Sequence, residues 1–315
     1  MDTHAVAMDN SIPSLLLVLG IKSLLNWTVV LGQRQHMVRS FLGSFCISLA
    51  LVDSLLTLAV SAIYGLEDFR LLGLRFTRYH ICLLVQIACF TYGLLHWPVF
   101  FLAGLDHYWT LWPGRHPLRW TRRLAYAWAA CAVWAATLFY VFAASGFRPD
   151  TGEGSHLLLR RCLVFPSPQS TQVSSVLLLT VGCTLLYCSL GPLLPDGPRA
   201  GGPLSWHVLC LTIEPFLSTW APFVIFQMAL LLVWADVPAY LDMNVPWLCF
   251  LNSFLVGALS WKRFGAFRLG RTSSLTDGFC DWHFSSDSAG ANSSGGGKAP
   301  NTSKTPALDE SWLTL

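Results

Sequence analysis

Charged side chains are scarce in this chain of 315 residues. Asp, Glu, Lys and Arg make up 12% of the sequence, about half of the roughly 25% that is usual in soluble proteins. Apolar residues make up 54%, and the mean hydropathy is positive. This balance argues against an ordinary soluble domain and suits a protein whose main solvent is the lipid bilayer. The small net charge of +3 gives no sign of a nucleic-acid partner.

The sequence also lacks the residue patterns that enzymes use. We find no phosphate-binding loop, no zinc-binding spacing of Cys and His, and no nucleophile elbow. The histidines of the apolar stretches are dispersed, and none stands beside a nucleophile. We therefore expect no enzyme activity, no cofactor and no metal site.

Seven stretches are long and apolar enough to cross a bilayer, which takes about 20 residues. The first ten residues carry no basic region, so the first stretch is expected to be a span and not a cleaved signal peptide. The pattern predicts an all-α bundle of seven transmembrane helices. The stretches cover residues 12–31, 41–65, 79–109, 124–146, 172–194, 206–234 and 239–261.

The composition changes after residue 270 to Ser, Gly, Asn and Pro with few apolar residues. Such a segment cannot bury enough apolar surface to fold. We therefore predict three parts: an extracellular segment 1–11, a helix bundle 12–270, and a disordered cytoplasmic tail 271–315.

The positions of Lys and Arg favour an amino terminus outside the cell, because cytoplasmic loops are enriched in these residues. With that orientation the outer segments carry Arg70, Arg75, Arg78, Arg148, Arg160 and Arg161. The inner segments carry nearly twice as many, namely Arg34, Arg39, Arg115, Arg119, Arg122, Arg123, Arg199, Lys262, Arg263, Arg268 and Arg271.

Short motifs recur at consistent spacings along these stretches, and together they resemble the rhodopsin-like (class A) G-protein-coupled receptors. The resemblance implies an orphan receptor of the plasma membrane, with a short amphipathic eighth helix at Phe267-Arg268. It also implies an extracellular ligand, and heterotrimeric G proteins and arrestin as partners. The motifs are Asn26; Leu49, Ala50 and Asp53; Cys82, which lies 25 residues before His107; Asp106-His107-Tyr108; Trp134; Phe216, Trp220 and Pro222; and Asn252-Ser253.

Cys82 and Cys162 both fall at expected outer positions, where the environment is oxidising. A disulfide between them is feasible and would hold the long second outer loop over the bundle. The alternative is a pair of free thiols. The other cysteines lie mostly within spans and are expected to be small buried hydrophobes.

The sequence departs from the family pattern where receptors of this family contact G proteins. In the third-span motif His107 replaces arginine, and an imidazole is shorter than a guanidinium and usually neutral at pH 7. In the seventh span Gly257 and Ser260 stand where the family has proline and tyrosine. The packing switch of Phe216, Trp220 and Pro222 is retained. Ligand sensing is therefore expected, while G-protein coupling is in doubt. The alternatives are a non-coupling receptor-like binding protein or scaffold and, less favoured, a transporter.

A ligand pocket is expected among residues of the third, sixth and seventh spans. Cys89 stands where aminergic receptors have aspartate, and Phe250 where retinal-binding receptors have lysine, so a lipid or a peptide is favoured over an amine. Helix packing alone is the alternative for most of these residues. The expected pocket residues are Gln86, Cys89, Phe90, Trp220, Phe223, Gln227, Asp242, Asn244 and Trp247.

Several polar residues fall near the middle of their spans and predict a polar switch in the core. In the family, the position of Asp53 binds a sodium ion. Because an unpaired charge at the bilayer centre is costly, we expect Lys22 or His96, or both, to contact Asp53 in place of sodium. The alternative is that Lys22 extends to an interface. The expected switch residues are Lys22, Asn26, Asp53, His96 and Asn252.

Overall fold

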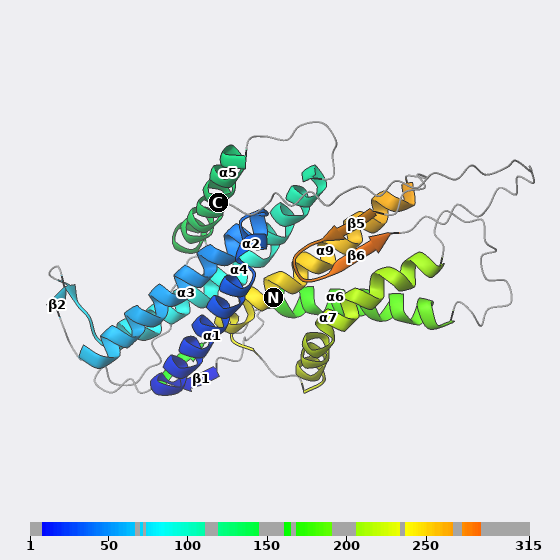
Figure 1. Cartoon of the computed structure of the whole chain (residues 1–315). Helices are drawn as coiled ribbons and strands as arrows, with labels where there is room; N and C mark the ends of the chain where they lie inside the picture. The colour runs from blue at the N-terminus through cyan, green and yellow to red at the C-terminus, as the bar shows by residue number, and fades with distance from the viewer. Residues whose placement is uncertain are drawn as a thin grey trace, which may run out of the picture.

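The computed structural model of the chain consists of helices that run back and forth, with three short two-stranded sheets (Figure 1). The residues that the structure describes are 8–66, 70–71, 74–110, 119–144, 161–164, 168–190, 206–233, 237–266 and 273–284.

Within the described residues, six of the seven apolar stretches of the sequence are each helical, and the last one is divided between α8 and α9. Five helices are long and apolar enough to cross a membrane, and the other two contain shorter apolar stretches at 172–186 and 245–261. The short helix α2 (Arg34–Met37) joins the first two long ones. The long elements are α1 (Ile12–Gly32), α3 (Phe41–Leu66), α4 (Arg78–Thr110), α5 (Arg119–Phe139) with its π-helical continuation η1 (Tyr140–Ala144), α6 (Pro168–Leu190), α7 (Trp206–Val233), and α8 (Ala239–Asp242) followed by α9 (Val245–Ala266).

The first helices bury several polar side chains and expose many large apolar ones. In α1, Leu17 and Leu24 are 66% and 69% exposed, whereas Lys22 is 4% exposed and Asn26 is fully buried. This arrangement would be costly in water, where polar groups belong on the surface. It is the arrangement expected of a helix whose outer face meets lipid.

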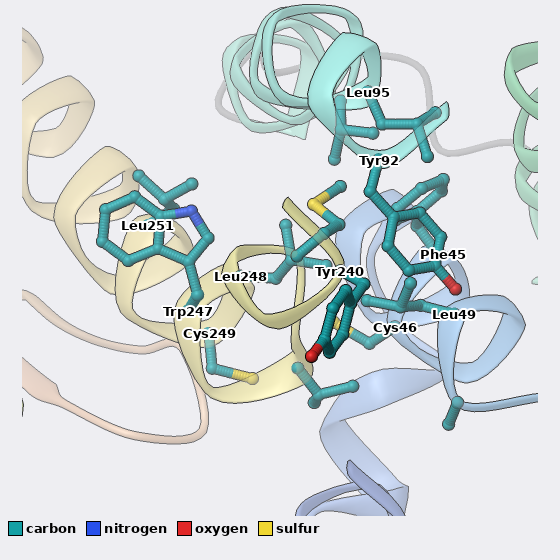
Figure 2. Packing of buried hydrophobic residues seen from close by; sticks show 14 of the residues in the cluster. Phe45, Cys46, Leu49, Tyr92, Leu95, Tyr240, Trp247, Leu248, Cys249 and Leu251 are labelled. Atoms are coloured by element: carbon teal, nitrogen blue, oxygen red, sulfur yellow. The ribbon is translucent and has the colours of Figure 1, made fainter. Parts of the chain in front are cut away.

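α3 occupies the centre of the packing, with α1, α4, α5 and α9 as neighbours. Figure 2 shows Phe45 and Leu49 of α3 in one apolar cluster with Tyr92 of α4. α6 and α7 pack on each other at one side of the molecule, where α7 also contacts α9 (Figure 1). Tertiary packing therefore joins α3 closely to both α1 and α4, whereas α7 is held mainly by α6, α9 and one strand.

Three short antiparallel pairs complete the fold. β1 (Met8–Ser11) pairs with β4 (Arg161–Val164), and β2 (Arg70–Leu71) pairs with β3 (Leu74–Arg75). β5 (Ser273–Thr276) and β6 (Asp281–Phe284) form a hairpin.

The β5–β6 hairpin corrects the prediction that the whole of 271–315 is disordered. Residues 273–284 are folded, because Cys280 and Trp282 are buried against the helices at 1% and 4% exposure. These few apolar residues supply the buried surface that the average composition of the tail lacks. The rest of the predicted tail, and the predicted eighth helix at Phe267-Arg268, lie outside the described residues.

Candidate functional site

The carboxylate of Asp53 lies at the centre of a buried polar cluster. Lys22 Nζ donates to Asp53 Oδ1 at 2.9 Å, and Asn26 Nδ2 donates to Oδ2 at 2.7 Å. The hydroxyl of Tyr92 donates to Oδ1 at 2.7 Å. Both carboxylate oxygens are therefore satisfied by side chains of α1 and α4.

The fold of α1 explains how two of these donors reach one carboxylate. Lys22 and Asn26 are four residues apart, so they lie on the same face of the helix. The ammonium group of Lys22 also lies 4.4 Å from the ring centre of Tyr92, a cation–π arrangement that stabilises a buried cation. Asn26 Oδ1 accepts the backbone N–H of Val245 at 3.0 Å. The cluster thus connects α1, α3 and α4 to the first residue of α9.

The Lys22–Asp53 contact gives the cluster a cation of its own. The side chains of the pair are 3% and 1% exposed, so water does not screen the attraction. A buried charge is tolerated when it is paired and hydrogen-bonded, and both conditions are met here. The ammonium group of Lys22 therefore balances the charge of the Asp53 carboxylate inside the bundle.

Two other expected switch residues lie apart from this cluster. His96 is buried but makes no hydrogen bond with Asp53; Tyr92, one turn away on α4, makes that contact instead. Asn252 bonds to His107, with its Oδ1 2.7 Å from Nε2 of the imidazole. The expected contact between Lys22 and Asp53 is therefore present, while the idea that His96 shares it is wrong.

The end of α4 carries a second polar network. Asp106 Oδ1 accepts the hydroxyl of Tyr126 at 2.6 Å, and its Oδ2 accepts the backbone N–H of Phe41 at 3.0 Å. Arg122 Nη2 donates to the carbonyl of Arg39 at 2.6 Å. Asp106 is thus bonded to Phe41 of α3 and Tyr126 of α5. Its neighbour His107 bonds instead to Asn252 of α9.

Cys82 and Cys162 form a disulfide, with their Cα atoms 5.1 Å apart. It joins the start of α4 to β4, where Cys162 lies opposite Asn10 of β1. The bond therefore ties β4, and β1 that pairs with it, to the end of the bundle where α4 begins.

Comparison with known proteins decides the family. The rat protein named probable G-protein coupled receptor 160 is 34% identical over 275 residues, which cover 81% of each chain. The human protein of that name is 33% identical over 287 residues, or 85% of this chain and 84% of its own. The mouse protein is 35% identical over 288 residues, or 85% of each chain. This chain belongs to the G-protein coupled receptor 160 family.

Membership of the receptor 160 family confirms the prediction of a seven-transmembrane helix bundle and of a multi-pass membrane protein. It also supports a receptor and not an enzyme. No family model and no solved structure matches the chain. Among the described residues, no group of three His, Cys, Asp or Glu side chains could hold a metal ion.

Three of the expected pocket residues meet in an aromatic cluster between α7 and α9. The ring centres of Trp220 and Phe223 are 6.1 Å apart, and those of Phe223 and Trp247 are 5.8 Å apart. Phe250 lies 5.6 Å from both tryptophan rings. Separations of this size are favourable for aromatic rings.

The remaining expected pocket residues lie on α4, on α7, and at or just after the end of α8. Gln86 and Cys89 are buried in α4, where Phe90 is half-buried; Gln227 is half-buried in α7. Asn244 directly precedes α9; its Oδ1 accepts the N–H of Trp247 at 2.9 Å, and its Nδ2 donates to the carbonyl of Leu241 at 2.6 Å. Asp242 ends α8.

A groove of about 840 Å³ lies between α4 and α5, away from the expected pocket residues. None of the nine expected pocket residues lines it. Its walls are apolar, formed by Leu94, Pro98 and Leu102 on one side and by Ala129, Ala132 and Val133 on the other. The groove therefore gives no support to the expected pocket.

Sequence reasoning did not identify Tyr92, Tyr126 or Trp282 as contact residues. Tyr92 carries a weak signal, because it is a hydroxyl-bearing residue one turn before His96, at nearly the same depth. Tyr126 carries none, since a tyrosine in a span is usually packing. Trp282 carries a signal that is recognisable only once the structure is known, because a large apolar side chain in a Ser/Gly-rich segment can mark a buried contact.

Proposed function

We propose that this chain is a receptor that binds a lipid or a peptide at its outer end and signals across the plasma membrane by rearrangement of its helices. The observation that carries the proposal is a continuous path of aromatic contacts along α7 and α9. It runs from Trp247 through Phe223, Trp220 and Phe250 to Phe216, with ring centres 5.5–6.1 Å apart at each step. A ligand that displaces the first rings would move the last ones.

The orientation in this proposal places the amino terminus and the Cys82–Cys162 disulfide outside. Two features support it. The inner segments carry more Lys and Arg than the outer ones, and disulfides persist in oxidising environments. The Asp106 end of the bundle then faces the cytoplasm.

The polar core supports a receptor with its own internal cation. In the proposal, Lys22 serves at Asp53 as sodium serves in rhodopsin-like receptors, holding α1 and α3 together. Asn26 also binds the backbone of the first residue of α9. A movement of α9 would therefore shift Asn26 and change its hydrogen bond with Asp53. The set Lys22, Asn26, Tyr92 and Asp53 is therefore the proposed core switch.

A specific observation favours the second candidate function, a receptor-like binding protein or scaffold that does not couple to G proteins. The short imidazole of His107 is held by Asn252. The face that a G protein or arrestin would use, formed by Asp106, His107 and Tyr108, thus lacks the long forked cation that rhodopsin-like receptors present there.

We expect His107→Arg to raise the basal second-messenger level in cells. A guanidinium is longer than an imidazole and always charged, so it can extend past Asn252 toward a cytoplasmic partner. The measurement compares basal levels of the variant and the unchanged chain at equal surface expression.

His107→Ala is the matched control, because it removes the bond to Asn252 without adding a cation. A rise in both variants would assign the effect to release of α9 and not to the arginine. An unaltered level in His107→Arg would favour the scaffold function.

A further inference from the structure

The β5–β6 hairpin is seated on the aromatic path between α7 and α9. The ring of Trp282 stacks on Phe216 with ring centres 6.1 Å apart, and the ring of Phe279 lies 5.5 Å from Trp220. Cys280, between them, is 1% exposed. The hairpin therefore covers Phe216 and Trp220, two of the three residues of the expected packing switch.

The helices accommodate the hairpin at specific points. Gly257 of α9 has no side chain, and a Cβ at this position would collide with the ring of Trp282. On α7, the hydroxyl of Thr219 donates to the carbonyl of Phe279 at 3.4 Å, and the thiol of Cys280 donates to the carbonyl of Pro215 at 3.8 Å. Residues of two helices thus form one binding surface for the hairpin, which we call its seat: Pro215, Phe216, Thr219 and Trp220 of α7 and Gly257 of α9.

The turn between β5 and β6 is fixed by hydrogen bonds of Asp277 and packs closely against α2. Asp277 Oδ1 accepts the backbone N–H groups of Phe279 and Cys280 at 2.8 and 2.7 Å, which fixes the turn. Gly278 has a φ of 94° and lies against the ring of His36 in α2, where a side chain would not fit. Burial, together with Asp277, raises the pKa of the Cys280 thiol to about 11.

An isolated two-stranded hairpin is marginally stable in water, so the stability of this one comes from its seat. The hairpin is tethered to α9 by only residues 267–272, so it acts at a high effective concentration. Loss of the contacts of Trp282 should therefore both unfold the hairpin and uncover the seat.

We propose that the β5–β6 hairpin is an intramolecular plug. It occupies a surface of α7 and α9 that a cytoplasmic protein can bind only after the hairpin leaves, and it holds Phe216 and Trp220 in their present packing. The proposal rests on the proposed function and orientation, which place this seat at the cytoplasmic side.

A cross-linking experiment in the full chain tests the seat itself. Thr219→Cys places a thiol beside Cys280, and copper phenanthroline with oxygen oxidises the two thiols to a disulfide. A protease site introduced within 267–272 allows the tail to be cut off, so that only the disulfide retains it. We expect the tail to stay attached in Thr219→Cys and to be lost in the neighbouring Ser218→Cys and in Thr219→Cys/Cys280→Ser.

Basal second-messenger levels at equal surface expression test the inhibitory role. Trp282→Ala removes the anchor from the hairpin, and Gly257→Ala obstructs its seat from the helix side. We expect both to raise the basal level, and more so with His107→Arg present. Because the two changes act from opposite sides of one contact, combining them should add little to either alone.

The cross-link and the basal levels together distinguish the plug from the receptor function. Absence of the Thr219–Cys280 cross-link would overturn the plug and leave the receptor function standing. A cross-link with basal levels unaltered by Trp282→Ala, where His107→Arg alone raises them, would overturn the inhibitory role. A cross-link with no response in any variant would make the hairpin a structural clasp and would overturn receptor coupling as well.

Discussion

Lys22→Met is expected to destabilise the folded receptor by roughly 3–5 kcal/mol, the cost of leaving one member of a buried ion pair alone. The change removes the cation 2.9 Å from Asp53 and leaves the carboxylate fully buried. Asn26 and Tyr92 still donate hydrogen bonds to it, but neither supplies a charge. The measurement is the melting temperature of the purified protein, together with its surface expression.

The double variant Lys22→Met/Asp53→Asn separates the lost charge balance from the lost packing. An amide has nearly the shape of the carboxylate and carries no charge, so the double variant should recover part of the stability. Ser23→Ala is the matched control, because the hydroxyl of this neighbour bonds to that of Ser54 at 3.0 Å and carries no charge. A Lys22→Met variant that melts like the unchanged protein would contradict the ion-pair account.

Cys82→Ser is expected to remove most of the receptor from the cell surface. The disulfide closes a loop of 80 residues, and loss of such a bond typically costs about 2–5 kcal/mol. It would also free β4 and with it β1, since the two strands pair at Cys162. Surface labelling of a tagged protein measures the effect.

Cys162→Ser should match Cys82→Ser, and the double variant should be no worse than either, because the two thiols act as one bond. Cys183→Ser is the control, since Cys183 is a free and exposed cysteine of α6. Normal surface expression of Cys82→Ser would also argue against the proposed orientation. With Cys82 facing the reducing cytosol, the bond would not form and its loss would have no effect.

The helices were predictable because long apolar runs can be buried only by lipid or by each other. The contact between Lys22 and Asp53 was predictable for a related reason. A charge in the middle of a span needs a partner, and few candidates exist at that depth. Four-residue spacing then placed Asn26 on the same face as Lys22.

The choice of Tyr92 over His96 was not predictable from the sequence. The two residues are four apart on α4 and share one face, so reasoning from depth alone cannot tell which reaches Asp53. The position of α4 relative to α3 decides it, and tertiary packing sets that position. For the same reason Asn252, expected in the core cluster, meets His107 instead.

The β5–β6 hairpin escaped prediction because its stability is not local. Its residues lie in a segment of polar and small residues, and its apolar anchors are few. Phe279, Cys280 and Trp282 become a folded unit only where α7 and α9 bury them. A composition average over the whole tail hides such a short anchored segment.

The measurement that tests the central claim most directly is the thermal stability of the purified receptor in sodium chloride and in potassium chloride at equal ionic strength. In the proposed core switch, the ammonium group of Lys22 takes the place of a bound sodium ion at Asp53. We therefore expect equal melting temperatures in the two salts. A melting temperature raised selectively by sodium would show that the ion still binds beside Asp53 and would contradict the account.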